Sequence, residues 1–140
     1  MGVFKMFKRI WWEFEDLAWK LKRNVQRFIR GYADSDSYDI SSWFIEMLEP
    51  MLRRLQATNK GYPERYGDEG WTKRLGEMAD CLHYMDEKNV IGEPEKFSKA
   101  LTEDGCHLSW SDYEEIRDIV LKNRDKFFEM FKEDFYDLWD

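Results

Sequence analysis

One helical stripe, in residues 4–30, constrains the fold of this 140-residue chain more than any other feature. Its apolar residues recur at steps of three and four, the spacing that places side chains on one face of an α-helix. They are Phe4, Phe7, Trp11, Phe14, Ala18, Leu21, Val25 and Phe28. Gly31 follows at the position where a glycine commonly ends a helix. The sequence therefore predicts a first helix over residues 4–30.

The same spacing recurs along the chain and predicts an all-α fold, a compact bundle of about four main helices with a short extra helix and long loops. Further helices are predicted over residues 40–58, 71–87, 93–102 and 111–139. Pro50 lies inside the second helix and should kink it or start it afresh. Pro94 suits the first turn of the short helix, which should end near Gly105. Residues 111–114 have the pattern of a capping box. The length favours a single helical domain over residues 1–140.

The charge is distributed unevenly. Residues 1–30 hold eight Lys or Arg against three acidic residues, a net charge of +5. The whole chain has a net charge of −7, so residues 31–140 carry −12. An acidic remainder repels phosphate, so no direct nucleic-acid partner is expected. The asymmetry indicates either internal pairing of basic and acidic elements or two separate docking surfaces.

No run of about 18 apolar residues is present, so we expect no membrane-spanning segment. The basic first helix mixes Trp with Lys and Arg beside a strong apolar stripe, a composition that suits a membrane surface. A stripe at helical spacing is more often part of a core, so we expect no membrane partner. The two cysteines make no disulfide framework, which favours a reducing, cytoplasmic setting.

The clusters of potential metal ligands do not predict a metal site. Cys81 and His83 are two positions apart on a helix and point in different directions, and Cys106 and His107 are adjacent, which rarely closes a tetrahedral site. Residues 34–39 resemble the start of a calcium loop but lack its glycine at the sixth place and its glutamate at the twelfth. We interpret them as a solvated, helix-capping turn and predict no cofactor.

Two pairs of carboxylates keep an enzymatic alternative open. Glu46 and Glu49, and likewise Glu77 and Asp80, lie one helical turn apart, so each pair presents two carboxylates on one face. Two such pairs on facing helices can hold Mg²⁺ over a pyrophosphate. The pattern resembles the all-α nucleoside triphosphate pyrophosphohydrolases of the MazG-like kind, although Pro50 directly follows the first pair. This alternative makes the four carboxylates catalytic and Mg²⁺ the cofactor. We favour a protein that is not an enzyme.

Residues 30–40 read RGYADSDSYDI, residues 50–55 read PMLRRL, residues 61–63 read GYP, and Trp71 is the first residue of the helix predicted over residues 71–87. Over about residues 27–87, this order of turns and aromatic residues resembles a family of small proteins of tailed bacteriophages. Members carry an Arg-Gly-Tyr-Ser-Asp-like turn, a helix ending in a basic and leucine-rich stretch, a Gly-Tyr-Pro or Gly-His-Pro loop, and a helix that begins with Trp. Members are generally uncharacterised, so the resemblance implies a phage origin more than an activity.

These observations favour a phage-encoded, non-catalytic binding protein that acts on a host protein in the host cytoplasm, for example as an inhibitor of an anti-phage defence system. An alternative is a sponge that binds a small nucleotide signal between the protomers of a homo-oligomer, because arginines can grip phosphates and a tyrosine can stack on a base. The candidate binding residues are Tyr32, Asp34, Asp36, Asp39, Arg53, Arg54, Tyr62 and Arg65.

Overall fold

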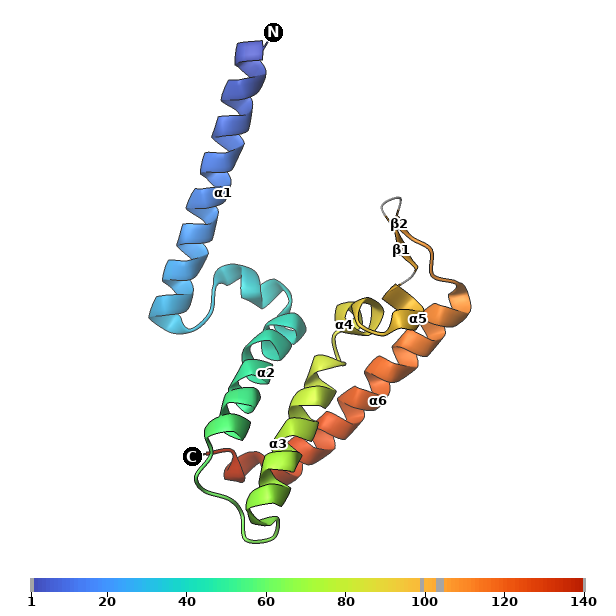
Figure 1. The fold of residues 1–140 in the computed structure, drawn as a ribbon. Coiled ribbons are helices and arrows are strands. Elements are labelled where there is room, and N and C mark those ends of the chain that lie inside the picture. Colours follow the sequence, from blue (N-terminus) through green and yellow to red (C-terminus); the bar gives the residue numbers. More distant parts are fainter. Residues whose placement is uncertain (1, 99, 103–104, 140) are drawn as a thin grey trace. The chain divides into compact units, whose positions relative to one another are not determined.

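The computed structural model describes residues 2–98, 100–102 and 105–139, with the side chains of residues 8–98, 100, 105 and 107–139. The described chain is helical apart from one pair of two-residue strands, which confirms the all-α class (Figure 1). Its elements are α1 (Gly2–Arg30), η1 (Asp34–Tyr38), α2 (Ile40–Thr58), α3 (Gly67–His83), α4 (Glu87–Gly92), α5 (Glu95–Ser98), β1 (Leu101–Thr102), β2 (Gly105–Cys106), α6 (Trp110–Asp134) and η2 (Phe135–Asp137).

The chain forms two compact units, Met1–Trp43 and Phe44–Asp140. The first contains α1, η1 and the first residues of α2. The second contains the rest of α2 and every later element. Both hydrophobic core clusters of the described residues lie within the second unit.

The main core cluster joins α2, α3 and α6. Helix α3 supplies its centre, with Trp71, Leu75 and Met78 fully buried, and runs alongside α6 (Figure 1). The Phe44 ring of α2 packs edge-on against Phe127 of α6, with the ring centroids 6.0 Å apart. Burial of large aromatic and aliphatic side chains is the main stabilising contribution in such a bundle. A second cluster links α4, α5 and the start of α6 through Val90, Phe97 and Ile116.

Helix α2 has the bounds that the sequence predicts, and it continues through Pro50 without a second start. A proline inside a helix removes one backbone hydrogen bond, to the carbonyl four residues earlier. Here both Pro50 and Glu46 are exposed, so water can reach that carbonyl and the helix tolerates the proline. Of the two predicted effects of Pro50, a second helix start is therefore wrong, and a kink stays a prediction.

The later boundaries differ from the prediction. Helix α3 begins and ends about four residues earlier than expected, so Gly67 and not Trp71 begins it. Beyond its end, Asp86 caps α4, its carboxylate accepting from the Lys88 N–H at 2.9 Å, so a separate helix begins where the predicted one would have continued. Within the predicted helix 93–102, α5 covers only Glu95–Ser98, directly after Pro94, and residues 101–102 form β1. Helix α4 and strand β2, on either side of this range, were not predicted. Gly105 lies in β2 with φ +130, a conformation that favours glycine, and does not end a helix.

The start of α6 also differs. Its capping box is formed by Ser109 and Asp112, two residues before the predicted one. The Ser109 hydroxyl accepts from the Asp112 N–H at 3.2 Å, and the Asp112 carboxylate accepts from the Ser109 N–H at 2.9 Å. The reciprocal pair satisfies two amides that a helix start leaves unpaired. None of the helices in the described ranges is both long enough and apolar enough to pass through a membrane.

Candidate functional site

A groove of about 650 Å³ lies in the second unit, along α2 and the C-terminal segment. One face of α2 forms its main wall, because Leu48, Met51, Leu52 and Leu55 follow the helical spacing. The lining residues are Leu48, Met51, Leu52, Arg54, Leu55, Thr58, Lys60, Leu138 and Trp139. This volume falls in the range of pockets that take a small molecule or a short apolar segment.

The groove is apolar inside and basic at one end. Leu52 is almost fully buried at its base, whereas Met51 and Trp139 are 60% and 63% exposed. Arg54 supplies a positive charge to the lining, and none of the described lining residues is acidic. Among the residues that the structure describes, Arg54 has no carboxylate within ion-pair distance. The groove can therefore bind an apolar group that carries a negative charge beside it.

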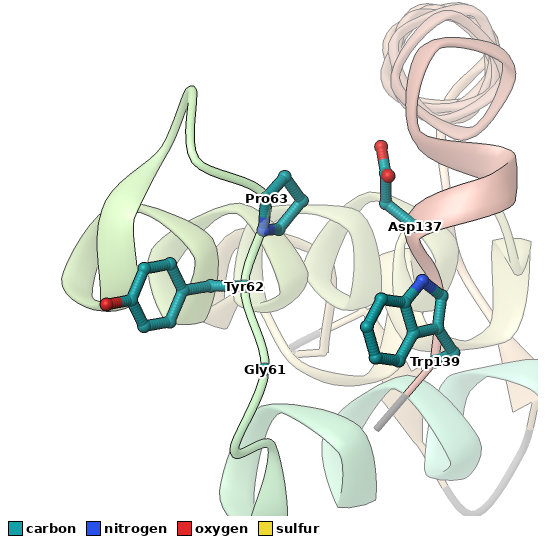
Figure 2. Close-up of a pocket in the computed structure, with 5 residues that line it drawn as sticks. All are labelled: Gly61, Tyr62, Pro63, Asp137 and Trp139. Carbon is teal, nitrogen blue, oxygen red and sulfur yellow. The ribbon is translucent and has the colours of Figure 1, made fainter.

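A smaller pocket adjoins the groove at Trp139 and contains the Gly61-Tyr62-Pro63 loop (Figure 2). The Trp139 indole faces the Gly61 backbone, and the Tyr62 ring points to the opposite side of the loop. A Cβ atom at Gly61 would lie 3.4 Å from Cζ3 of Trp139, an ordinary van der Waals contact, so the indole packs beside the backbone at Gly61. The loop that carries part of the family resemblance thus supports one wall of the groove.

A buried ionic cluster fixes the C-terminal segment. Asp134, which is 0% exposed, accepts hydrogen bonds from Arg65 Nη2 at 2.8 Å, from the Tyr66 hydroxyl at 2.9 Å and from Arg74 Nε at 2.7 Å. Arg65 also pairs with Asp137. These contacts join the start of α3 and its preceding loop to the end of α6, and so they position Leu138 and Trp139 as a wall of the groove.

The electrostatics of Asp134 support a structural role. Burial by itself would raise the pKa of this carboxyl, but the hydrogen bonds from Arg74, Arg65 and Tyr66 outweigh burial and lower the pKa. The same contacts raise the pKa of the Arg65 guanidinium. The charged pair is therefore stable at neutral pH, and the segment stays attached to α3.

A second polar cluster surrounds His83 at the end of α3. Its Nδ1 lies 3.0 Å from a Glu49 carboxylate oxygen and its Nε2 lies 2.5 Å from Glu93, while Tyr84 donates to Glu93 at 3.1 Å. Burial lowers the pKa of His83, but the two carboxylates raise it by more, so the imidazolium form is favoured. The imidazolium donates from both ring nitrogens and ties α2 to α4 and the residue that follows it.

The carboxylates of the enzymatic alternative are partly brought together. Arg53 lies 2.7 Å from Asp80 and 3.5 Å from Glu49, so it links the second member of each pair. Glu46 is exposed and Glu77 is half-buried. Among the described residues, no group of three or more His, Cys, Asp or Glu is placed to hold a metal ion. Cys81 is a buried free thiol, and the Cys106 side chain lies outside the described residues.

The acidic side chains of the Asp34–Asp39 turn form a hydrogen-bond network in the first unit. Asp36 accepts from Arg27 Nε and Nη2 at 3.0 and 2.6 Å and from the Ala33 N–H at 2.7 Å, and these bonds lower its pKa to about 2. Asp34 pairs with Arg30.

Asp39 caps α2, as predicted, by accepting from the Ser42 N–H at 3.0 Å. The three acidic side chains of the turn therefore hold local structure, while Tyr32 packs on the Arg30 guanidinium at 4.6 Å.

Of the arginines and the tyrosine that the sequence singles out in the second unit, two lie at the groove region. Arg54 lines the groove and Tyr62 lines the adjoining pocket, whereas Arg53 and Arg65 are engaged in ion pairs. The sequence interpretation missed Asp134, although a signal was present. Asp134 follows Phe127 by seven residues and Met130 by four, so a carboxylate on the buried stripe of α6 required a buried cationic partner.

Comparison of the chain with protein-family models, with curated proteins and with solved structures finds no match.

Proposed function

We propose that the chain is a non-catalytic binding protein that acts on a host protein, and that the groove of α2 and the C-terminal segment receives an apolar segment of that partner. The phage origin in this proposal is supported by the resemblance in residues 27–87. An inhibitor of an anti-phage defence system is one form that such a binding protein would take.

The observation that carries the proposal is the chemistry of the groove. Its walls are leucine, methionine and tryptophan side chains, and exposed apolar surface of this kind, bordered by charge, is typical of protein interaction sites. Met51 and Trp139 are the most exposed of the apolar lining residues and would act as anchors for the partner. Arg54 favours a partner segment that carries Asp or Glu beside its apolar residues.

The other candidate chemistry has less support. Arg53 lies between the two carboxylate pairs, so a positive charge stands where the pyrophosphohydrolase alternative would place Mg²⁺. Two of the three arginines of the nucleotide-sponge alternative are bound to carboxylates and would have to leave them before gripping a phosphate. Neither the pyrophosphohydrolase nor the nucleotide sponge is therefore favoured over partner binding at the groove.

Site-specific photo-crosslinking in host cells tests the proposal. Benzoylphenylalanine at Met51 should crosslink one host protein, because Met51 is exposed within the groove. The same group at Asp118, an exposed position on α6 that does not line the groove, is the matched control. We expect a single product from position 51, absent from position 118 and lost when Arg54→Glu is added. The same products from both positions, or none from position 51, would contradict the proposal.

A further inference from the structure

Helix α1 carries an apolar face that no core cluster contains. Within residues 8–30, all apolar residues except Trp12 and Trp19 lie on one side of the helix. At 3.6 residues per turn, these nine residues span an arc of roughly 120° around the helix axis, and no polar residue lies within the arc. These residues are Ile10, Trp11, Phe14, Leu17, Ala18, Leu21, Val25, Phe28 and Ile29, and within the first unit all of them are exposed. The buried residues of both core clusters lie within residues 45–130, and the partly buried residues packed against them lie within residues 44–138.

The opposite face of α1 is basic. The +5 charge of residues 1–30 comes from eight Lys or Arg against three acidic residues. Lys22 borders the apolar arc, so its stem can lie along apolar material while its ammonium stays in the polar layer. Trp12 and Trp19 lie outside the arc, with Trp19 packed against the Arg23 guanidinium at 4.5 Å.

The width of the apolar arc and the charge of the opposite face indicate which kind of partner α1 binds. A coiled-coil seam with a second copy needs only a narrow stripe, and it would bring two helices of +5 together. A wide, uninterrupted apolar arc with a basic opposite face is the pattern of a helix that lies in the plane of a membrane interface. Anionic headgroups attract the Lys and Arg side chains, and the acyl layer takes the apolar arc.

We propose that α1 binds flat on an anionic lipid surface, with its apolar arc inserted among the acyl chains. The helix crosses no membrane in this arrangement. The sequence alone favours a core role for the stripe, and the location of both core clusters in the second unit is what changes this interpretation. The proposal is independent of the partner-binding groove, because the groove lies on α2 and the C-terminal segment.

Vesicle flotation of the full-length protein tests the proposal. We expect it to float with vesicles of phosphatidylcholine and phosphatidylglycerol at about three parts to one, and at least about tenfold less with pure phosphatidylcholine. Raising NaCl from about 50 mM to about 500 mM should also weaken the association, because salt screens the attraction.

Two variants with the same charge change separate insertion from charge. Leu21→Asp places a carboxylate near the middle of the arc at an exposed position, and it should lower partitioning at least about tenfold. Arg9→Gln removes one positive charge from the opposite face and should lower partitioning into the vesicles by no more than about threefold. Circular dichroism should show unchanged helix content in both.

Three results would overturn the proposal. They are no flotation with the anionic vesicles, equal flotation with both compositions, and flotation that Leu21→Asp leaves intact. A dimer in sedimentation velocity that Leu21→Asp dissociates, without flotation, would assign the arc to a second copy. Burial of the arc against the rest of the chain would also give no flotation.

Discussion

Replacing Asp134 by alanine should destabilise the second unit more than removal of an exposed carboxylate from any of its surface ion pairs. The carboxylate is fully buried and accepts hydrogen bonds from Arg65, Tyr66 and Arg74. Breaking a buried pair by removing one partner costs about 3–5 kcal/mol of the free energy of unfolding. The Arg65 side chain is 49% exposed and can regain water, so we expect a smaller loss of about 2–3 kcal/mol.

Thermal and urea denaturation of the full chain measure this loss. At about 4 °C per kcal/mol for a unit of this size, Asp134→Ala should lower the Tm by roughly 10 °C. Glu133→Ala is the matched control, because Glu133 pairs with the same Arg74 at 2.6 Å but is 58% exposed. Its cost should stay below about 1 kcal/mol, as for other exposed ion pairs.

The pH dependence provides a second check. The pKa of Asp134 lies below its ordinary value of 3.8, so its contribution to stability is present above that value and is lost as the pH falls through the lowered pKa. The difference between the original protein and Asp134→Ala should therefore shrink in acid. A loss within about 0.5 kcal/mol for Asp134→Ala, or an equal loss for Glu133→Ala, would refute the role of the buried cluster.

Three further predictions concern single residues. The pKa of His83 is raised above 6.5, so its stabilising contribution is full below that value and is lost as the pH rises through the raised pKa. His83→Gln should therefore lower the free energy of unfolding, measured by urea denaturation, more at about pH 6 than at about pH 9. An equal loss at both pH values would contradict this. Asp36, held by Arg27, should titrate by NMR with a pKa of about 2, and a midpoint near 3.8 would show that the turn is open in solution. In Gly76→Ala, the new Cβ would lie 2.5 Å from Nε2 of Gln56, which is the far end of a flexible side chain. Gln56 should turn aside, and the free energy of unfolding should rise by up to about 1 kcal/mol because alanine favours the helix. A fall of more than about 1 kcal/mol in thermal denaturation would show that the Gln56 side chain cannot move.

The sequence predicted the elements that carry strong local signals. The bounds of α2 follow from an apolar period and from the Asp39 cap, and both are local features. The region 88–110 was predicted less well, because its two short helices and hairpin depend on contacts such as those of Val90 and Phe97 with Ile116 of α6. Weakly periodic segments take their structure from tertiary packing, which a local pattern does not contain.

The candidate site was predicted only in part for the same reason. Arg54 and Tyr62 were singled out by their residue types, and both lie at the groove region. The groove itself joins α2 to Leu138 and Trp139, which lie about eighty residues later in the sequence. Tertiary contacts bring these segments together, among them the Phe44–Phe127 ring contact between α2 and α6 and the packing of Leu138 against the core. A sequence pattern gives no distance between segments so far apart.

Arg53 and Arg65 show the limit of residue type as a guide to function. Both could grip a phosphate, but the fold places carboxylates 2.7 and 2.8 Å from them. Both arginines are therefore paired with carboxylates, whereas Arg54 lines the groove.

The most direct test of the partner-binding groove is the affinity of the purified chain for the host protein that position 51 crosslinks. Titration calorimetry should show at least about tenfold weaker binding for Met51→Asp, because the carboxylate enters the apolar groove. Ala57→Asp makes the same charge change at an exposed residue of α2 that does not line the groove, and it should change the affinity by less than about twofold. Equal affinities for Met51→Asp and the original chain would contradict the groove as the binding site.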